Sequence, residues 1–283
     1  MFTILIPSDF SKNATNAIRY ALQLTKKMPC RLIFFHGEII PAVGTSEIPF
    51  AYLEFDREAS QKQFEKYTGT IVKALKIKID PKNVSHLMTE GFSAAPLILD
   101  AADKTAADLI IMGARGATGM RKILFGSTAA DVIAKSKVPV LAVPESYLYS
   151  PVKKMLHASD LKNLKNELRM VLPVAKLFNA TLEVAHITDT SMADAKLITR
   201  AQSEVKRRSY KKMKLYVEAI TFGQNISRDI KQLTKRHHPD ILIMFRHEHN
   251  WLGRLFFTSR TENLVYESGV PILAFNIKSK STS

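Results

Sequence analysis

DLIIMGARGATGMRKILFGSTAADVIAKSKVPVLAV, residues 108–143, holds two short apolar runs separated by a glycine-rich loop and a helix-like segment. The runs at 108–113 and 138–143 are short and bounded by turn-forming residues, which favours buried strands. We expect a helix over 126–136, between the loop and the second run. A strand followed by a helix and another strand is typical of a parallel sheet covered by helices on both faces.

This unit occurs twice in the chain, which a search for internal repeats reveals. DLIIMG (108–113) matches DILIMF (240–245), and VPVLAV (138–143) matches VPILAF (270–275). The offset near the start of each copy is larger, so the first copy carries an insertion that includes residues 41–50. Two further pairs are PSDFSKN (7–13) with ASDLKN (158–163), and RLIFFH (31–36) with TLEVAH (181–186). The chain therefore consists of two diverged copies of one unit.

Within the first copy, apolar runs of strand length alternate with segments that have one apolar helical face. The expected strands are FTILIP, RLIFFH, VSHLMTEG, DLIIMG and VPVLAVP, and one of the expected helices covers about 52–76. The sequence thus predicts the α/β class, with two tandem, doubly wound, five-stranded parallel sheets. We place the two domains at 1–146 and 147–283. Ligands of such sheets bind at the carboxyl ends of the strands.

The composition is that of a globular protein, with 46% hydrophobic and 24% charged residues in 283. The formal charge is +15, but the basic residues are spread along the chain and no nucleic-acid-binding motif accompanies them, so we do not expect nucleic-acid binding. The first residues lack the features of a secretory signal, and no run reaches the roughly 20 apolar residues of a membrane span. With Cys30 as the single cysteine, we expect a cytoplasmic protein without disulfides.

The loop after residue 112 concentrates glycine, since four of the 11 glycines lie between Gly113 and Gly126. The amide groups at a helix start have no partners within the helix and carry partial positive charge, which suits an anion. Gly126 would let a phosphate approach the backbone, and Arg115 could supply positive charge. The alternative is a flexible turn in which Ser127 caps the helix. The spacing matches neither the P-loop nor the dinucleotide fingerprint.

The pattern Gly113-x2-Gly116-x9-Gly126-Ser127 resembles the ATP-binding motif of the universal stress protein family, and PSDFS and VPVLAVP lie where that family has them. The resemblance covers essentially the whole chain and identifies it as a tandem member. It implies a five-stranded parallel sheet in each copy. It also implies a pseudo-dimer, in which Val138–Val143 pairs with Val270–Phe275.

The resemblance also implies a nucleotide site in the first copy. Asp9 would contact the ribose, Pro7 would shape the adenine pocket and the backbone at Gly37 would meet the adenine edge. The loop and the helix start would hold ribose and phosphates, with Mg²⁺ or Mn²⁺ at the terminal phosphates. The alternative role of Asp9 is to cap the following helix. The expected site consists of Pro7, Asp9, Gly37, Met112, Gly113, Arg115, Gly116, Gly126, Ser127 and Thr128.

The second copy departs from this motif. Phe245 stands in place of Gly113, Glu248 in place of Gly116 and Thr258 in place of Gly126, whereas Ser259 and Asp160 match Ser127 and Asp9. The added side chains and the added negative charge oppose a phosphate at that loop. We therefore predict one ATP site per chain, in the first copy.

Four histidines of the second copy could form a metal site, because imidazole is a common zinc ligand. They are His157 and His186 near strand ends, and His247 and His249 on the altered loop. The alternative is that they are separate core and surface residues.

The predicted function is that of an ATP-binding stress-response sensor or regulator. One alternative is an interaction protein that binds no nucleotide. Another is slow ATP hydrolysis or self-phosphorylation on Ser127 or Thr128, although no group that would position water is identifiable, so catalysis stays undecided. The expected partners are ATP, the other half of the chain, a second copy of the chain in a homodimer, and unidentified proteins. We do not expect the protein to bind a membrane.

Overall fold

The computed structural model describes residues 1–40, 57–114, 127–188, 195–219, 226–246 and 269–276. The first half contains β1 (Phe2–Pro7), α1 (Lys12–Thr25), β2 (Cys30–Ile39), α2 (Arg57–Ala74), a 3-10 turn (Pro81–Asn83), β3 (Val84–Gly91), α3 (Ala94–Lys104), β4 (Leu109–Gly113), α4 (Ser127–Lys135) and β5 (Val140–Val143). The second half contains β6 (Lys154–Ser159), α5 (Leu164–Leu177), β7 (Thr181–Thr188), α6 (Ala195–Lys206), β8 (Met213–Ala219), α7 (Ile226–His237), β9 (Ile241–Arg246) and β10 (Ile272–Asn276).

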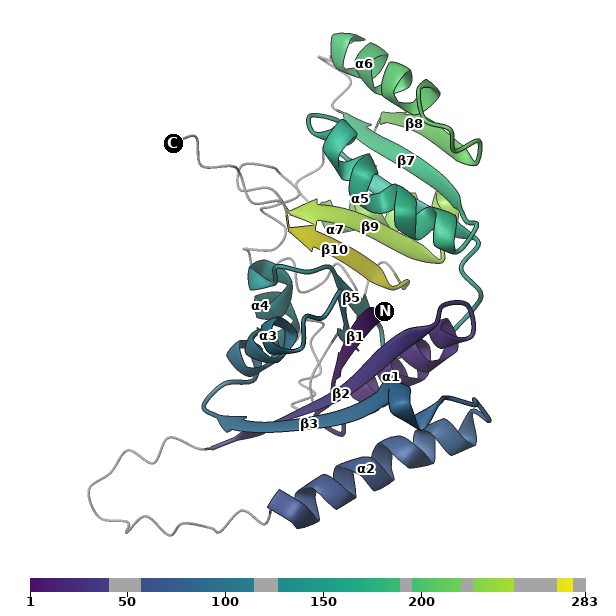
Figure 1. Cartoon of the computed structure of the whole chain (residues 1–283). Helices are drawn as coiled ribbons and strands as arrows, with labels where there is room; N and C mark the ends of the chain where they lie inside the picture. Colours follow the sequence, from purple (N-terminus) through teal and green to yellow (C-terminus); the bar gives the residue numbers. More distant parts are fainter. Residues whose placement is uncertain (41–56, 115–126, 189–194, 220–225, 247–268, 277–283) are drawn as a thin grey trace, which may run out of the picture.

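The strands form one ten-stranded sheet in the order β3-β2-β1-β4-β5-β10-β9-β6-β7-β8. Within each half all neighbouring strands are parallel, and the order of the second half mirrors that of the first. Figure 1 shows the first half, in purple to teal, below the second half, in green to yellow. The alternation of strands and helices that the sequence predicts is therefore present in both halves.

The two halves meet where their last strands pair. Strands β5 and β10 are antiparallel neighbours, and Leu273 lies opposite Leu141. This is the strand pairing that the sequence leads us to expect, and it joins two five-stranded sheets into one. That it reproduces a dimer interface of related proteins stays a prediction. The domain boundary that we propose, between residues 146 and 147, falls in the connection from β5 to β6.

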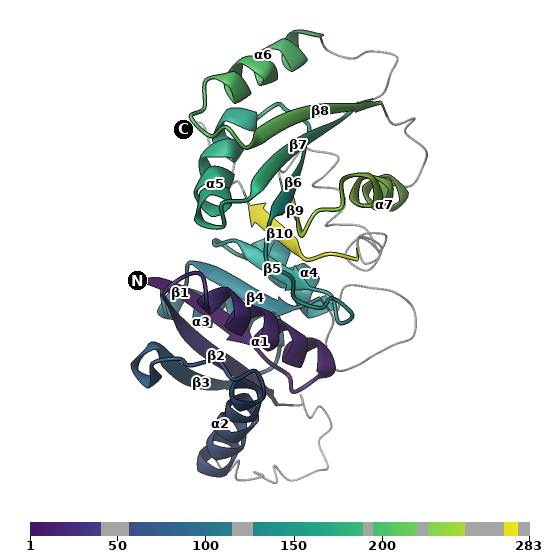
Figure 2. The ribbon, with the colours of Figure 1, turned by 90° about the vertical axis from the view of Figure 1, so that its right-hand side faces the viewer.

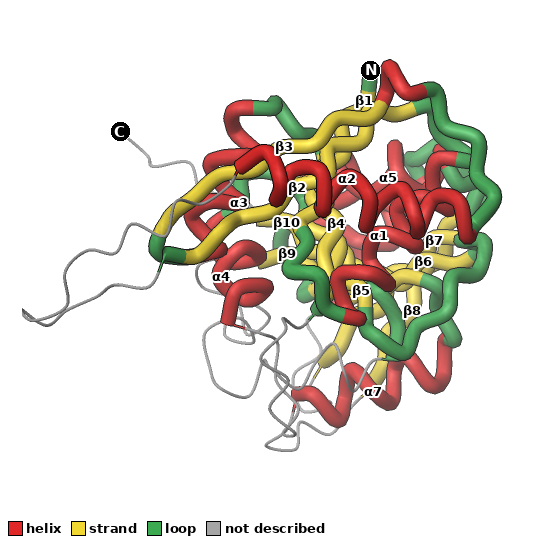
Figure 3. The backbone as a smooth tube through the Cα atoms, turned by 90° about the horizontal axis from the view of Figure 1, so that it is seen from below, coloured by secondary structure: helices red, strands yellow, loops and turns green. Residues whose placement is uncertain are grey.

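Helices cover both faces of the sheet, so two separate apolar layers form. One layer packs α1, α2, α5 and α6 against one face, with Ile18 and Val171 at its centre, and the other packs α3, α4 and α7, with Ile98 and Leu233. Figure 2 shows α5 and α7 on opposite sides of the second-half strands, and Figure 3 shows α3 and α4 on the other side of the strands from α1 and α2. Both layers continue across the β5–β10 junction. Among the described helices, none is long and apolar enough to cross a membrane.

A repeated aspartate holds the first strand of each half in register. The Asp108 carboxylate, just before β4, accepts a hydrogen bond from Thr3 N at 2.8 Å, and the Asp240 carboxylate, just before β9, accepts one from Lys154 N at 2.9 Å. Asp240 also accepts from Ser150 in the connection between the halves. The repeated aspartate of DLIIMG and DILIMF thus has a structural role in both copies.

Candidate functional site

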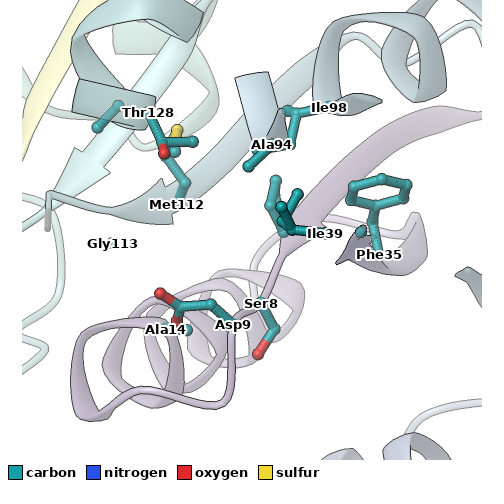
Figure 4. Close-up of a pocket in the computed structure, with 13 residues that line it drawn as sticks. Ser8, Asp9, Ala14, Phe35, Ile39, Ala94, Ile98, Met112, Gly113 and Thr128 are labelled. Atoms are coloured by element: carbon teal, nitrogen blue, oxygen red, sulfur yellow. The ribbon is translucent and has the colours of Figure 1, made fainter. Parts of the chain in front are cut away.

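A pocket opens at the carboxyl ends of β1, β2 and β4, between the first turns of α1, α3 and α4 (Figure 4). The carboxyl edge of a parallel sheet is where loops from several strands converge. The figure shows Asp9 across the pocket from Met112 and Thr128. The lining residues are Pro7, Ser8, Asp9, Ala14, Phe35, Gly37, Ile39, Ala94, Ile98, Met112, Gly113, Thr128 and Ala129.

Six of the ten residues that the sequence predicts for the site line this pocket: Pro7, Asp9, Gly37, Met112, Gly113 and Thr128. They come from four separate segments of the chain. Ser127 is the first residue of α4 but is exposed and does not line the pocket. Arg115, Gly116 and Gly126 lie outside the described residues.

The turn after β1 presents the carboxylate of Asp9. Ser8 Oγ accepts a hydrogen bond from Phe10 N at 3.2 Å, and Asp9 Oδ1 accepts one from Ser11 N at 3.1 Å. Phe10 adopts a left-handed conformation with φ of 60°. The cap of α1 is Ser11, whose Oγ accepts from Ala14 N at 3.1 Å. Asp9 therefore does not cap α1 in the usual way, and its exposed side chain lies at the pocket.

Gly37 offers backbone groups to the pocket. Strand β1 ends beside Phe35, whose carbonyl accepts a hydrogen bond from Ser8 N at 2.8 Å. Because backbone groups alternate sides along a strand, the N–H and C=O of Gly37 point the same way as those of Phe35, but beyond the end of β1. A donor and an acceptor on one edge of the pocket suit a flat ligand with complementary groups, such as a purine base.

Gly113 has a structural reason to lack a side chain. A Cβ there would lie 2.9 Å from both the carbonyl carbon and the Cβ of Asn13 in the first turn of α1. Real Cβ atoms do not approach this closely, so any side chain would push α1 away from β4. The bare backbone at this position thus results from helix packing as well as from its place at the pocket.

The interior of the pocket is apolar, and of its apolar side chains named here the sequence analysis identified Met112 alone. Phe35 is a buried strand residue, and Ala94 and Ile98 lie on the inner face of α3. The signal that could have found them is periodicity. Residues 35, 37 and 39 share one face of a strand, and residues 94 and 98 share one face of a helix. Apolar walls with a few polar groups at the rim are typical of small-molecule sites.

The second half repeats the turn but not the pocket chemistry. Ser159 Oγ accepts from Leu161 N at 3.0 Å, Asp160 Oδ1 accepts from Lys162 N at 3.0 Å, and Leu161 has a φ of 63°. Whereas Asp9 is exposed, Asp160 is only 6% exposed. The two turns are copies of one local structure in different surroundings.

Phe245 on strand β9 stands at the position that corresponds to Gly113 on β4. Strand register makes the two positions equivalent, since Gly113 lies opposite Val143 and Phe245 lies opposite Phe275. The Phe245 ring is buried, stacks on Phe275 with centroids 4.7 Å apart and meets the His157 ring edge-on at 5.1 Å. Glu248, Thr258 and Ser259 lie outside the described residues.

The two described histidines of the expected metal site are engaged elsewhere. His157 is fully buried, with Nε2 2.8 Å from Glu167 Oε2, and Ser159 Oγ donates to the same oxygen at 2.7 Å. His186 Nδ1 lies 3.1 Å from the carbonyl oxygen of Ser159, as His36 Nδ1 lies 2.8 Å from that of Ser8. Over the described part of the chain, no group of three or more His, Cys, Asp or Glu could hold a metal. His247 and His249 lie outside it, so the four-histidine site stays a prediction.

The comparisons with known proteins agree with this architecture. The sequence model of the universal stress protein family matches residues 1–144 and again residues 152–276. A universal stress protein of Methanocaldococcus jannaschii is 30% identical over 146 residues, which is 50% of this chain and 80% of the relative. One from Thermus aquaticus is 30% identical over 142 residues, covering 50% of this chain and 97% of the relative.

The crystal structure of a universal stress protein from Archaeoglobus fulgidus superposes on both halves together, with a TM-score of 0.71 and 19% identity over 99% of this chain and 97% of that one. That likeness shows the tandem fold. The two matches of the family model cover every described helix and strand of the two halves. The chain therefore belongs to the universal stress protein family and contains two of its domains in tandem.

Proposed function

We propose that the first half binds ATP in the pocket at the ends of β1, β2 and β4. The observation that carries the proposal is the convergence there of a carboxylate, a pair of backbone groups and a helix start, from Asp9, Gly37 and Thr128. A carboxylate accepts hydrogen bonds from ribose hydroxyls, and helix N-termini favour phosphates. The family to which the chain belongs is consistent with this assignment.

The size of the pocket supports a division of the ligand. The pocket has a volume of about 120 Å³, whereas ligand pockets usually have about 300–1,000 Å³. We therefore assign it the base and ribose, between the apolar walls and Asp9. The phosphates would extend past Thr128 toward residues 115–126, which lie outside the described part of the chain.

We propose that Mg²⁺ or Mn²⁺ enters with the phosphates rather than in a cage of side chains. In the described ranges no cluster of three potential ligands is present. Magnesium commonly keeps several waters and binds through one or two carboxylates plus the substrate's phosphates.

The second half is proposed to bind no ATP in the corresponding place and to act instead as a regulatory and dimerisation surface. Phe245 supports this, because its buried ring occupies the position that corresponds to Gly113. The chain would then report ATP occupancy as a cytoplasmic stress-response sensor, alone or as a homodimer. The alternative is that the chain is an interaction protein that binds no nucleotide, and the next experiment distinguishes the two.

The direct test is to purify the protein without added nucleotide, denature it and chromatograph the supernatant, then titrate the refolded or nucleotide-free protein with ATP. We expect bound adenine nucleotide, or ATP binding with a stoichiometry of one. No nucleotide in the supernatant together with no heat of binding would contradict the proposal. Asp9→Ala should weaken ATP binding. Because Asp9 Oδ1 also accepts a hydrogen bond from Ser11 N, unfolding curves of this variant establish that it is folded.

A further inference from the structure

The carboxyl end of helix α4 is held by side chains of the other half of the chain. Asn276 Nδ2, at the end of β10, donates to Ile133 O and to Ser136 O, both at 2.7 Å. Arg246 Nη1, at the end of β9, donates to Ala134 O at 2.6 Å. Asn276 and Arg246 lie directly opposite each other on these neighbouring strands. Together they form a clamp, defined here as Arg246 and Asn276 with the three carbonyls they bind.

The clamp supplies partners that a helix end needs. The last carbonyls of a helix have no partner within it, and they carry partial negative charge. At α4 the chain itself satisfies Val132 O through Ser136 N at 2.8 Å. The side chains of the clamp satisfy the carbonyls of Ile133, Ala134 and Ser136, and the guanidinium of Arg246 complements the negative end of the helix.

The opposite end of the same helix lines the pocket. Thr128 and Ala129, in its first turn, are pocket residues. A helix of nine residues is about 13 Å long, so the clamp lies one short, rigid element away from the site. The buried face of α4, at Ala129 and Val132, packs in the same apolar layer as Ile272 of β10. Strand β10 of the second half therefore contacts α4, and the clamp holds the carboxyl end of the helix.

We propose that Arg246 and Asn276 are positioning residues for nucleotide binding, through which the second half sets the place of α4 at the pocket of the first. The proposal rests on the proposed function, because the ligand at the start of α4 is the nucleotide assigned there. It gives the second half a role that requires no ligand of its own. Neither clamp residue touches the pocket, so an effect on binding must pass through the helix.

The test compares Asn276→Ala and Arg246→Met with wild-type protein and with Tyr210→Phe. Tyr210 is the matched control, since its hydroxyl donates to Ala175 O and Ala180 O at the end of α5, wholly within the second half. Two quantities are measured: amide hydrogen exchange in peptides that cover residues 127–136 of the nucleotide-free protein, and the Kd for ATP by calorimetry. Circular dichroism and unfolding curves establish which variants are folded.

We expect faster exchange at the hydrogen-bonded amides of α4, residues 131–136. We also expect an ATP Kd raised about 2- to 30-fold in both clamp variants, the range usual for residues that couple distant sites. Tyr210→Phe should leave both quantities unchanged. Unchanged exchange at residues 131–136 would overturn the clamp, and faster exchange with an unchanged Kd would overturn its effect on binding. If wild-type protein binds no ATP, the proposed function and the positioning role both fail, while exchange still decides whether the clamp orders α4.

Discussion

Replacing Gly113 with alanine tests the packing of α1 against β4. The added Cβ would lie 2.9 Å from the carbonyl carbon and 3.0 Å from the carbonyl oxygen of Asn13. Those are backbone atoms, which cannot rotate away, so the first turn of α1 must move. Overpacking of this kind costs about 1–3 kcal/mol. Because Gly113 has no positive φ, the loss of chain entropy in the unfolded state offsets about 0.4–1 kcal/mol of that cost.

The expected net loss for Gly113→Ala is therefore about 0–2.6 kcal/mol in the free energy of unfolding. Gly69→Ala is the matched control, because a Cβ on Gly69 in α2 meets nothing within 4 Å. That variant should be about 0.4–1 kcal/mol more stable than wild type. Gly37→Ala should fall between them, since its Cβ would meet the flexible Leu97 side chain at 3.1 Å.

Urea denaturation of the nucleotide-free protein, followed by circular dichroism, measures the order of the three variants. The midpoint of the transition that includes the first half is compared between variants, and the dependence of the unfolding free energy on urea concentration is checked for constancy. Equal midpoints for Gly113→Ala and Gly69→Ala would refute the argument that α1 requires a bare backbone at residue 113.

Three further predictions concern buried groups. Burial raises the pKa of the Cys30 thiol to about 11, so a thiol reagent at pH 8 should label Cys30 far more slowly in the folded protein than in urea. Equal labelling rates in the two conditions would contradict the prediction. Desolvation lowers the pKa of His86 below 6.5, so the folded state favours the neutral ring and the free energy of unfolding should fall as pH drops below 6.5. His86→Gln should flatten this pH dependence between pH 7 and 5. An unchanged slope of stability against pH would exclude His86 as its source. Glu167→Ala leaves His157 and Ser159 without their shared acceptor and should lower the free energy of unfolding by about 3–5 kcal/mol in urea denaturation. Ser159→Ala should lower it by about 1 kcal/mol. Similar losses for the two variants would show that the carboxylate is not the centre of this cluster.

The fold could be predicted from the sequence because each strand is a short apolar run and the unit occurs twice. Comparison of the two copies also located the turn after the first strand of each, because Asp9 and Asp160 occupy equivalent positions. The left-handed conformations of Phe10 and Leu161 could not be predicted, since neither residue type favours a positive φ. They become understandable only when both turns are seen to use the same serine and aspartate hydrogen bonds.

The sequence predicted six of the residues that line the pocket, among them Asp9, Gly37 and Gly113, and their role in binding stays a prediction. The apolar interior of the pocket was not predicted beyond Met112, because Phe35 and Ile98 have the same composition and periodicity as ordinary core residues. The reason for Gly113 was also incomplete, since the contact with Asn13 joins residues 100 positions apart. The clamp on α4 lay beyond sequence reasoning for the same reason: Asn276 reaches Ile133 only because β10 pairs with β5.

The central claim is that the chain holds one ATP site, in its first half. Isothermal titration calorimetry of ATP into nucleotide-free wild type, Asp9→Ala and Asp160→Ala tests it most directly. The account predicts a stoichiometry of one, weakened by Asp9→Ala and unchanged by Asp160→Ala. Two equivalent sites per chain, or a single site that Asp160→Ala removes and Asp9→Ala spares, would contradict it.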